Sequence, residues 1–243
     1  MAVNYSPKIV TDGLVLCLDT GNKKSYPGLG SEWYDISGNN FHMSLKNSLT
    51  STTDDAGLKY FSLNGTNHYG KCDGTISGSV EATPTNLGIN GALPRSIICV
   101  ARLKSGVGST IGGLYDVGTY GVNGRHNSLR RNGSTTADPS SFRNNFWGTP
   151  DHDFTLSAFD WAMYSTVYGS DKKTKTYGNN GILLGQESVA FDLVTEGESF
   201  EMGRYQGSQE IGADIAYYTI YTKALTAAEV KQNYNALKSR FGI

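Results

Sequence analysis

Residues 214–230 read DIAYYTIYTKALTAAEV and place a strand directly before a helix. The first eight of these residues are rich in aromatic and β-branched types, which suit a pleated, half-buried strand. Thr226 is followed three residues later by Glu229, a capping box in which each side chain bonds an otherwise unpaired backbone N–H. Four apolar side chains then share one helical face, and a glycine follows them (Val230, Tyr234, Leu237, Phe241 and Gly242). The pattern predicts a C-terminal helix over residues 226–241.

Short strand patterns account for most of the remaining chain. The strongest central strand is residues 95–103 (RSIICVARL), and residues 58–63 alternate with period two. Asn180-Gly181 is the best hairpin signal, because both turn positions need positive φ. Asn64-Gly65 offers a further two-residue turn. Other strand segments lie at residues 13–19, 41–45, 111–117, 161–168, 172–177, 182–184 and 199–204. About ten strands and one terminal helix predict an all-β fold, a sandwich of two antiparallel sheets.

Length and composition favour one folded unit. The chain has 243 residues, and β-sandwiches often reach that size as a single domain. Its 30 Gly and only 6 Pro indicate many tight turns rather than a disordered linker. We therefore expect a single domain over residues 1–243, with a loop-rich insertion at residues 118–153 that contains short strand segments around residues 128–130 and 143–147.

Charge and cysteine usage exclude several classes of protein. The 21 basic and 22 acidic residues leave a net charge of −1, which argues against a nucleic-acid partner. No run of about 18 apolar residues predicts a membrane span, and the start of the chain does not look like a secretory signal. Cys17, Cys72 and Cys99 are odd in number and widely spaced, so we expect buried free thiols made in a reducing cytoplasm rather than disulfides or a zinc site.

Several segments, in order along the chain, resemble the laminin-G-like family of concanavalin A-like jelly rolls. The segments are residues 33–39 (WYDISGN), 61–69 (FSLNGTNHY), 177–181 (YGNNG), 202–204 (MGR) and 214–230. The last of these is the most specific, whereas residues 211–213 (IGA) depart from the aromatic-x-Gly that the family usually shows. The resemblance implies a concanavalin A-like jelly-roll β-sandwich with one short C-terminal α-helix.

Two terminal segments, residues 5–15 and 233–242, also resemble free-standing members of this family encoded by tailed bacteriophages. That likeness implies a non-enzymatic virion protein assembled in the host cytoplasm: a capsid decoration, a fibre or a tail accessory. Its partners would be other virion proteins, further copies of itself and a cell-surface glycan. Two alternatives remain, a free-standing carbohydrate-binding lectin module and a glycoside hydrolase, because a fold does not determine a function.

The candidate binding surface lies in the least regular part of the chain, residues 125–147. A sugar site needs exposed aromatic rings that stack on pyranose faces, together with side chains that bond hydroxyl groups. The excess of Arg there suits a protein partner equally well, and Phe146 and Trp147 are alternatively explained as core residues. The candidate residues for carbohydrate or partner binding are Arg125, Asn127, Arg130, Arg143, Asn145 and Trp147.

Residues 196–201 (EGESFE) carry three carboxylates within one short segment. Glycoside hydrolases of this fold show a similar E-x-D-x-x-E pattern, in which two carboxylates about 5 Å apart support retention. Here Glu198 replaces the central Asp and Gly197 interrupts the strand. We interpret the segment as a solvated turn that leads into a strand, and no catalytic residue is predicted.

No cofactor is required by the sequence, but the family resemblance suggests calcium. Its candidate ligands are Asp35, Asn39 and Asp214. The alternative for Asp35 is a turn in which the carboxylate bonds its own backbone. Residues 151–153 (DHD) are a weaker candidate, because a hard cation prefers several oxygen ligands.

Overall fold

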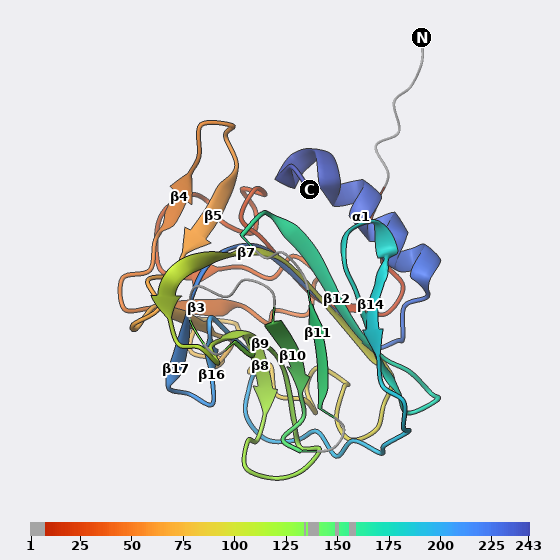
Figure 1. The fold of residues 1–243 in the computed structure, drawn as a ribbon. Helices are drawn as coiled ribbons and strands as arrows, with labels where there is room; N and C mark the ends of the chain where they lie inside the picture. Colours follow the sequence, from red (N-terminus) through yellow and green to blue (C-terminus); the bar gives the residue numbers. More distant parts are fainter. Residues whose placement is uncertain (1–7, 134, 136–140, 149–150, 156–158) are drawn as a thin grey trace.

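A computed structural model of the chain describes residues 8–133, 135, 141–148, 151–155 and 159–243. Two antiparallel sheets are stacked face to face, and one helix, α1 (Ala227–Phe241), lies against the outside of one of them (Figure 1). The fold class predicted from the sequence, an all-β jelly-roll sandwich with a C-terminal helix, is confirmed.

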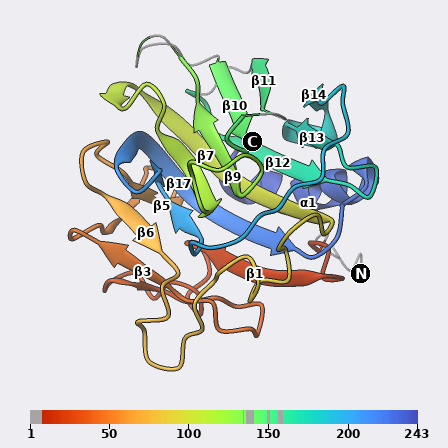
Figure 2. The same ribbon diagram turned by 90° about the horizontal axis from the view of Figure 1, so that it is seen from below.

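The nine-stranded sheet is built around the two longest strands. Figure 2 shows β1 (Leu14–Asp19), β17 (Gln209–Tyr221), β7 (Arg95–Gly108) and β12 (Ala162–Tyr168) side by side in this sheet. The path continues beyond β12 and beyond β17 through shorter strands. These are β13 (Thr174–Tyr177) and β14 (Leu183–Gln186) on one side, β5 (Lys59–Ser62) and β4 (Ser51–Thr53) on the other, and β16 (Arg204–Tyr205), which pairs with β17.

The eight-stranded sheet forms the other layer of the sandwich. In spatial order it contains β11 (His152–Thr155), β10 (Ser141–Asn145), β9 (His126–Arg131), β8 (Gly113–Gly118), β15 (Glu201–Met202), β6 (Tyr69–Lys71), β3 (Met43–Lys46) and β2 (Glu32–Trp33). Strands β8 to β11 follow one another in the sequence, whereas β15 and β6, next along the sheet from β8, come from distant parts of the chain.

Alternation of side chains along the strands produces two separate apolar layers. In β5, Phe61 enters the main core between the sheets, whereas Tyr60 joins the layer beneath the helix. Val230, Leu237 and Phe241 of α1 complete that second layer. The helix therefore covers the outer face of the nine-stranded sheet, and no helix of the described residues lies over the outer face of the eight-stranded sheet.

The local signals at the hairpin and at the helix are confirmed. Asn180 and Gly181 have φ values of 60° and 70°, and they connect β13 to β14 through a single 3-10 turn, Asn179–Gly181. At the helix start, the Thr226 side chain accepts the backbone N–H of Glu229 and the Glu229 side chain accepts that of Thr226. The three cysteines are buried and free, as expected.

The structure adds detail to one region and corrects another. Within residues 118–153, the described residues supply β9, β10 and the start of β11 to the eight-stranded sheet, with loops between them. Leu129 of β9, Phe142 of β10 and Phe154 of β11 join the main core. Asn64-Gly65 closes no hairpin, because the chain there crosses from β5 to β6 in the other sheet; Gly65 has a φ of 69°, and a Cβ on it would collide with the backbone of Gly108.

Within the described residues, no helix combines the length and the apolar character that a membrane crossing requires.

Candidate functional site

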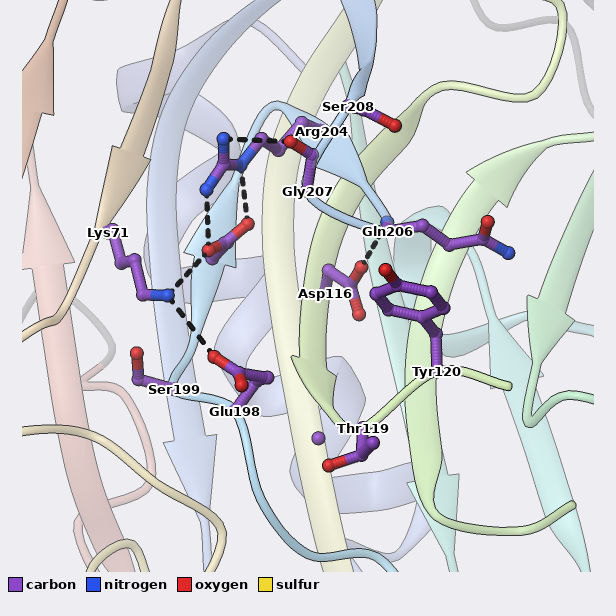
Figure 3. Close-up of a pocket in the computed structure, with 12 residues that line it drawn as sticks. Lys71, Asp116, Thr119, Tyr120, Glu198, Ser199, Arg204, Gln206, Gly207 and Ser208 are labelled. Carbon is purple, nitrogen blue, oxygen red and sulfur yellow. Dashed lines mark hydrogen bonds and ion pairs between the residues drawn. The ribbon is translucent and has the colours of Figure 1, made fainter. Parts of the chain in front are cut away.

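A pocket of about 720 Å³ opens on the outer face of the eight-stranded sheet. Figure 3 shows charged, hydroxyl and aromatic side chains around it, contributed by strands and by the loops that join them. The lining residues are Lys71, Asp116, Gly118, Thr119, Tyr120, Glu198, Ser199, Glu201, Arg204, Gln206, Gly207 and Ser208.

Strand register places the central charges of the pocket in one row. Glu201 of β15 lies directly opposite Lys71 of β6 on one side and Asp116 of β8 on the other. Because Tyr115 and Val117 point into the core, Asp116 between them must point outward. The same row continues through Ser128 of β9 to Asn145 of β10. It therefore joins the pocket to the segment that the sequence had marked for binding.

Glu201 is the electrostatic centre of the pocket. The Nε and Nη2 atoms of Arg204 donate to its two carboxylate oxygens at 2.6 and 2.8 Å, and Lys71 Nζ lies 3.0 Å from Oε1. Lys71 also lies 3.4 Å from the exposed carboxylate of Glu198 (Figure 3). Burial alone would raise the pKa of Glu201, but the bonds from Arg204 and then Lys71 hold that pKa below its ordinary value.

A buried polar network forms the neighbouring wall. Asp116 accepts the backbone N–H of Gln206 at 2.8 Å and bonds to the ring of His126, which is fully buried. The other ring nitrogen of His126 lies 3.2 Å from the side-chain oxygen of Asn145, and Tyr205 donates its hydroxyl to the same oxygen at 2.7 Å. These contacts fix the short β16 segment against the sheet, so the pocket wall is preformed rather than assembled by a ligand.

Four of the six predicted binding residues lie on this outer face or at its edge, and each side chain contacts a partner within the protein. Arg143 is held by Asp151 and Asp153, and the amide of Asn145 donates to Asp151 at 2.7 Å. Arg130 is buried, with its guanidinium 5.1 Å from the centre of the Tyr205 ring. The remaining member of this group, Arg125, pairs with Glu196 at 3.0 Å.

Asn127 does not belong to this surface. It precedes Ser128 by one residue on β9 and therefore points to the opposite side of the sheet. Its side-chain oxygen accepts a hydrogen bond from Arg95 Nε at 3.3 Å in the interior, and only 1% of the residue is exposed. The sequence analysis placed it with its neighbours by residue type, without assigning a face of the strand to each position.

Trp147 lies at the rim, beside an aromatic residue that the sequence analysis missed. The rings of Trp147 and Tyr120 are 6.1 Å apart between centroids, and Tyr120 is 50% exposed in the pocket lining. Trp147 has a φ of 65°, a backbone conformation that bulky residues seldom adopt. Such strain is found preferentially at binding and catalytic sites.

Other members of the pocket were also outside the predicted set. Lys71, Asp116 and Arg204 come from three distant parts of the sequence, so no spacing rule connects them. The available signals were weak: a carboxylate inside the apolar run of β8, and Arg204 within the MGR motif of the family resemblance.

Two of the three candidate calcium ligands, Asp35 and Asn39, lie in one turn and both bond Ser37, whereas Asp214 has other contacts. Asp35 accepts backbone N–H groups of Cys17, Ser37 and Phe41, which is the turn-forming alternative. Asn39 donates to the Val15 carbonyl oxygen. The third candidate, Asp214, is bonded on β17 by Ser62, Arg102 and Lys104, none of which contacts Asp35.

Across the described part of the chain, no group of three or more His, Cys, Asp or Glu side chains is arranged to hold a metal ion. Calcium binding stays a prediction of the family resemblance.

Comparison with known proteins identifies the fold. No protein-family model matches the chain, and no curated protein matches its sequence. Among solved structures, domain 4 of the extracellular arabinanase AbnA from Geobacillus stearothermophilus, in complex with arabinotriose, has a TM-score of 0.61 at 15% identity and covers 91% of this chain and 98% of that domain. The binding domain of botulinum neurotoxin DC, in complex with SialylT, has a TM-score of 0.64 at 13% identity over 93% of this chain and 52% of its own.

A third similar structure is the Trypanosoma rangeli sialidase, in complex with the inhibitor DANA. It has a TM-score of 0.62 at 11% identity and covers 95% of this chain and 35% of the sialidase. At these identities the likeness defines the fold alone. The chain shares the jelly-roll β-sandwich fold of these structures, which is consistent with the concanavalin A-like architecture.

Proposed function

We propose that this chain is a non-catalytic glycan-binding protein, with its ligand on the outer face of the eight-stranded sheet. The observation that carries the proposal is the combination of a preformed polar pocket with an exposed aromatic rim. Thr119, Ser208 and Glu198 offer groups that bond sugar hydroxyls, and Tyr120 offers a ring face for a pyranose. Ligand sites commonly combine a concave shape with a few well-placed polar groups in this way.

The similar structures support the proposal of glycan binding. The arabinanase domain was solved with arabinotriose, and a botulinum neurotoxin type C structure concerns cell entry that depends on two ganglioside molecules. An arabinanase and a sialidase also stand among the similar proteins, so catalysis has to be weighed from the residues themselves.

The charges of the pocket favour binding over hydrolysis. A glycosidase needs one carboxylic acid with a raised pKa to protonate the leaving oxygen. In the stretch that resembles the hydrolase pattern, Glu201 has a lowered pKa, and the Lys71 ammonium contacts both Glu201 and Glu198. The lowered pKa of Glu201 suits hydrogen-bond acceptance rather than proton donation.

Binding is tested by applying the purified protein to a glycan array and measuring the dissociation constant of the strongest responder by calorimetry. We expect a dissociation constant of about 1 mM or tighter. Replacing Tyr120→Ala removes the stacking face and weakens binding by roughly fivefold, the equivalent of about 1 kcal/mol. Tyr234→Ala, on the helix that covers the other sheet, is the matched control and leaves affinity unchanged. The absence of binding to every glycan at millimolar concentration would refute the proposal.

The same glycan then tests for catalysis. We expect no cleavage product after prolonged incubation with the wild-type protein. Hydrolysis that Glu198→Gln abolishes would identify an enzyme instead.

We further propose that the protein is a surface component of a tailed bacteriophage particle, attached to other virion proteins as a decoration, fibre or tail accessory. This proposal rests on the resemblance of residues 5–15 and 233–242 to free-standing phage members. Mass spectrometry of purified particles, with antibody-gold imaging, tests it. We expect the chain in stoichiometric amounts on intact particles, and its absence from them would overturn the assignment.

A further inference from the structure

Every basic side chain that reaches the pocket is already neutralised by the protein itself. Arg204 donates through Nε and Nη2 to Glu201 and through Nη1 to the Gly207 carbonyl oxygen at 3.1 Å. Lys71 contacts the carboxylates of both Glu201 and Glu198. The two cations and two carboxylates therefore balance, and Asp116, the third acid in the lining, is bonded to His126.

The flanking cations on the same face are engaged in a similar way. Arg125 pairs with Glu196, Arg143 pairs with Asp151 and Asp153, and Lys46 pairs with Asp73 at 2.7 Å. Arg130 faces no carboxylate at bonding distance, but it is only 7% exposed, and its guanidinium packs on Tyr205 and bonds the Arg131 carbonyl oxygen and Asn132. None of these described basic side chains is both exposed to solvent and without a partner in the protein.

What the pocket presents to a ligand is instead a set of acceptors and hydroxyls. The Glu198 side chain is 64% exposed, and Thr119 and Ser208 open into the same space (Figure 3). A neutral sugar donates hydroxyl hydrogens to such groups without disturbing the ion pairs. An incoming carboxylate or sulfate would have to break a partly buried pair or lie near Glu201 and Glu198, and both routes are unfavourable.

We infer that, if this pocket is the glycan site proposed above, the sugar unit that occupies it is uncharged, and that sialylated, uronate or sulfated units are excluded. Selectivity then comes from rejection of the wrong charge as well as from attraction to hydroxyls.

Matched glycans that differ only in charge test the inference on the wild-type protein. N-acetyllactosamine is compared with its 3′-sialylated and 6-sulfated forms, and the same comparison is made for the best neutral responder of the array. We expect the acidic form to bind at least about tenfold more weakly. Tighter binding of an acidic form overturns the inference and leaves the glycan-binding proposal standing, whereas absence of binding to all glycans refutes the proposed function itself.

Removing the carboxylates that pair with Lys71 and Arg204 should weaken the preference for neutral over acidic glycans. Glu201→Gln leaves Lys71 and Arg204 without their shared carboxylate, so affinity for the acidic form rises by about fivefold or more relative to the neutral form. Glu198→Gln, at an exposed position that tolerates change, frees Lys71 in part and gives a gain of about twofold. The matched control Asp171→Asn frees Lys175 in a pair outside the pocket and leaves the preference unchanged. An unaltered preference in folded Glu198→Gln and Glu201→Gln proteins would also overturn the inference.

Discussion

Glu187 makes stability depend on pH in the neutral range. It directly follows β14, is 6% exposed, and its Oε2 atom has no hydrogen-bond partner among the described residues. Burial is the main cause that raises its pKa from 4.5 to about 8; an opposing hydrogen bond with the backbone of Thr174 lowers it, and the nearby charge of Asp151 raises it further. The folded protein therefore keeps this carboxyl protonated where the unfolded chain would release the proton.

The sign of the effect follows from proton binding. Below pH 4.5 the Glu187 carboxyl is protonated in both the folded and the unfolded state, so its contribution to the free energy of unfolding is fully present. Between pH 4.5 and about 8 only the folded state holds the proton, so the free energy of unfolding falls as pH rises. Each pH unit in that interval corresponds to about 1.4 kcal/mol, which gives a loss of roughly 3 to 5 kcal/mol at pH 8.

The assay is urea unfolding of wild type and Glu187→Gln at intervals from pH 4 to pH 8.5. Because other groups titrate in the same range, the informative quantity is the difference in unfolding free energy between the two proteins. We expect the variant to gain stability relative to wild type as pH rises, by roughly 3 to 5 kcal/mol across the interval. Asp192→Asn, at a side chain that is 76% exposed, is the control and should follow the wild-type profile. A constant difference for Glu187→Gln over the whole range would refute the reasoning.

Two other predictions concern buried groups. Arg95 donates to the Ile89, Gly91 and Leu93 carbonyl oxygens, each at 3.1 Å, and to Thr195. Arg95→Met leaves these acceptors without a donor and should lower the free energy of unfolding in urea by about 3 to 5 kcal/mol. A loss below about 1 kcal/mol would contradict the buried network. The cysteines should react with a thiol reagent only after unfolding, since burial raises the pKa of Cys17 to about 12, and rapid labelling of the native protein would disprove this.

Local patterns were sufficient where the physical cause is local. The capping box at Thr226 and Glu229, the positive φ at Asn180-Gly181 and the alternation through residues 58–63 each involve neighbours in the sequence, and the structure has all three. The extent of the strands within residues 118–153 was harder to predict, because inward positions there include Asn127 and Asn144 as well as apolar residues.

The candidate site was predicted only in part, and strand parity explains the division. Arg130, Arg143 and Asn145 share the outer face because they occupy outward positions on β9 and β10. Asn127 lies one position before the outward-facing Ser128, so its side chain enters the interior. Composition identifies the residue types of a binding segment, but a shift of one position along a strand reverses the side to which each points.

The amino-acid sequence by itself thus determined a two-sheet β-sandwich with one capped helix, because side-chain periodicity and helix capping depend on residues that are close together in the sequence. The tertiary structure alone decided where the pocket forms. Lys71, Asp116 and Glu201 are far apart in sequence, and only the order β6, β15, β8 brings them into one row. That order depends on how the whole set of strands buries its apolar faces, a property of the complete core rather than of any segment.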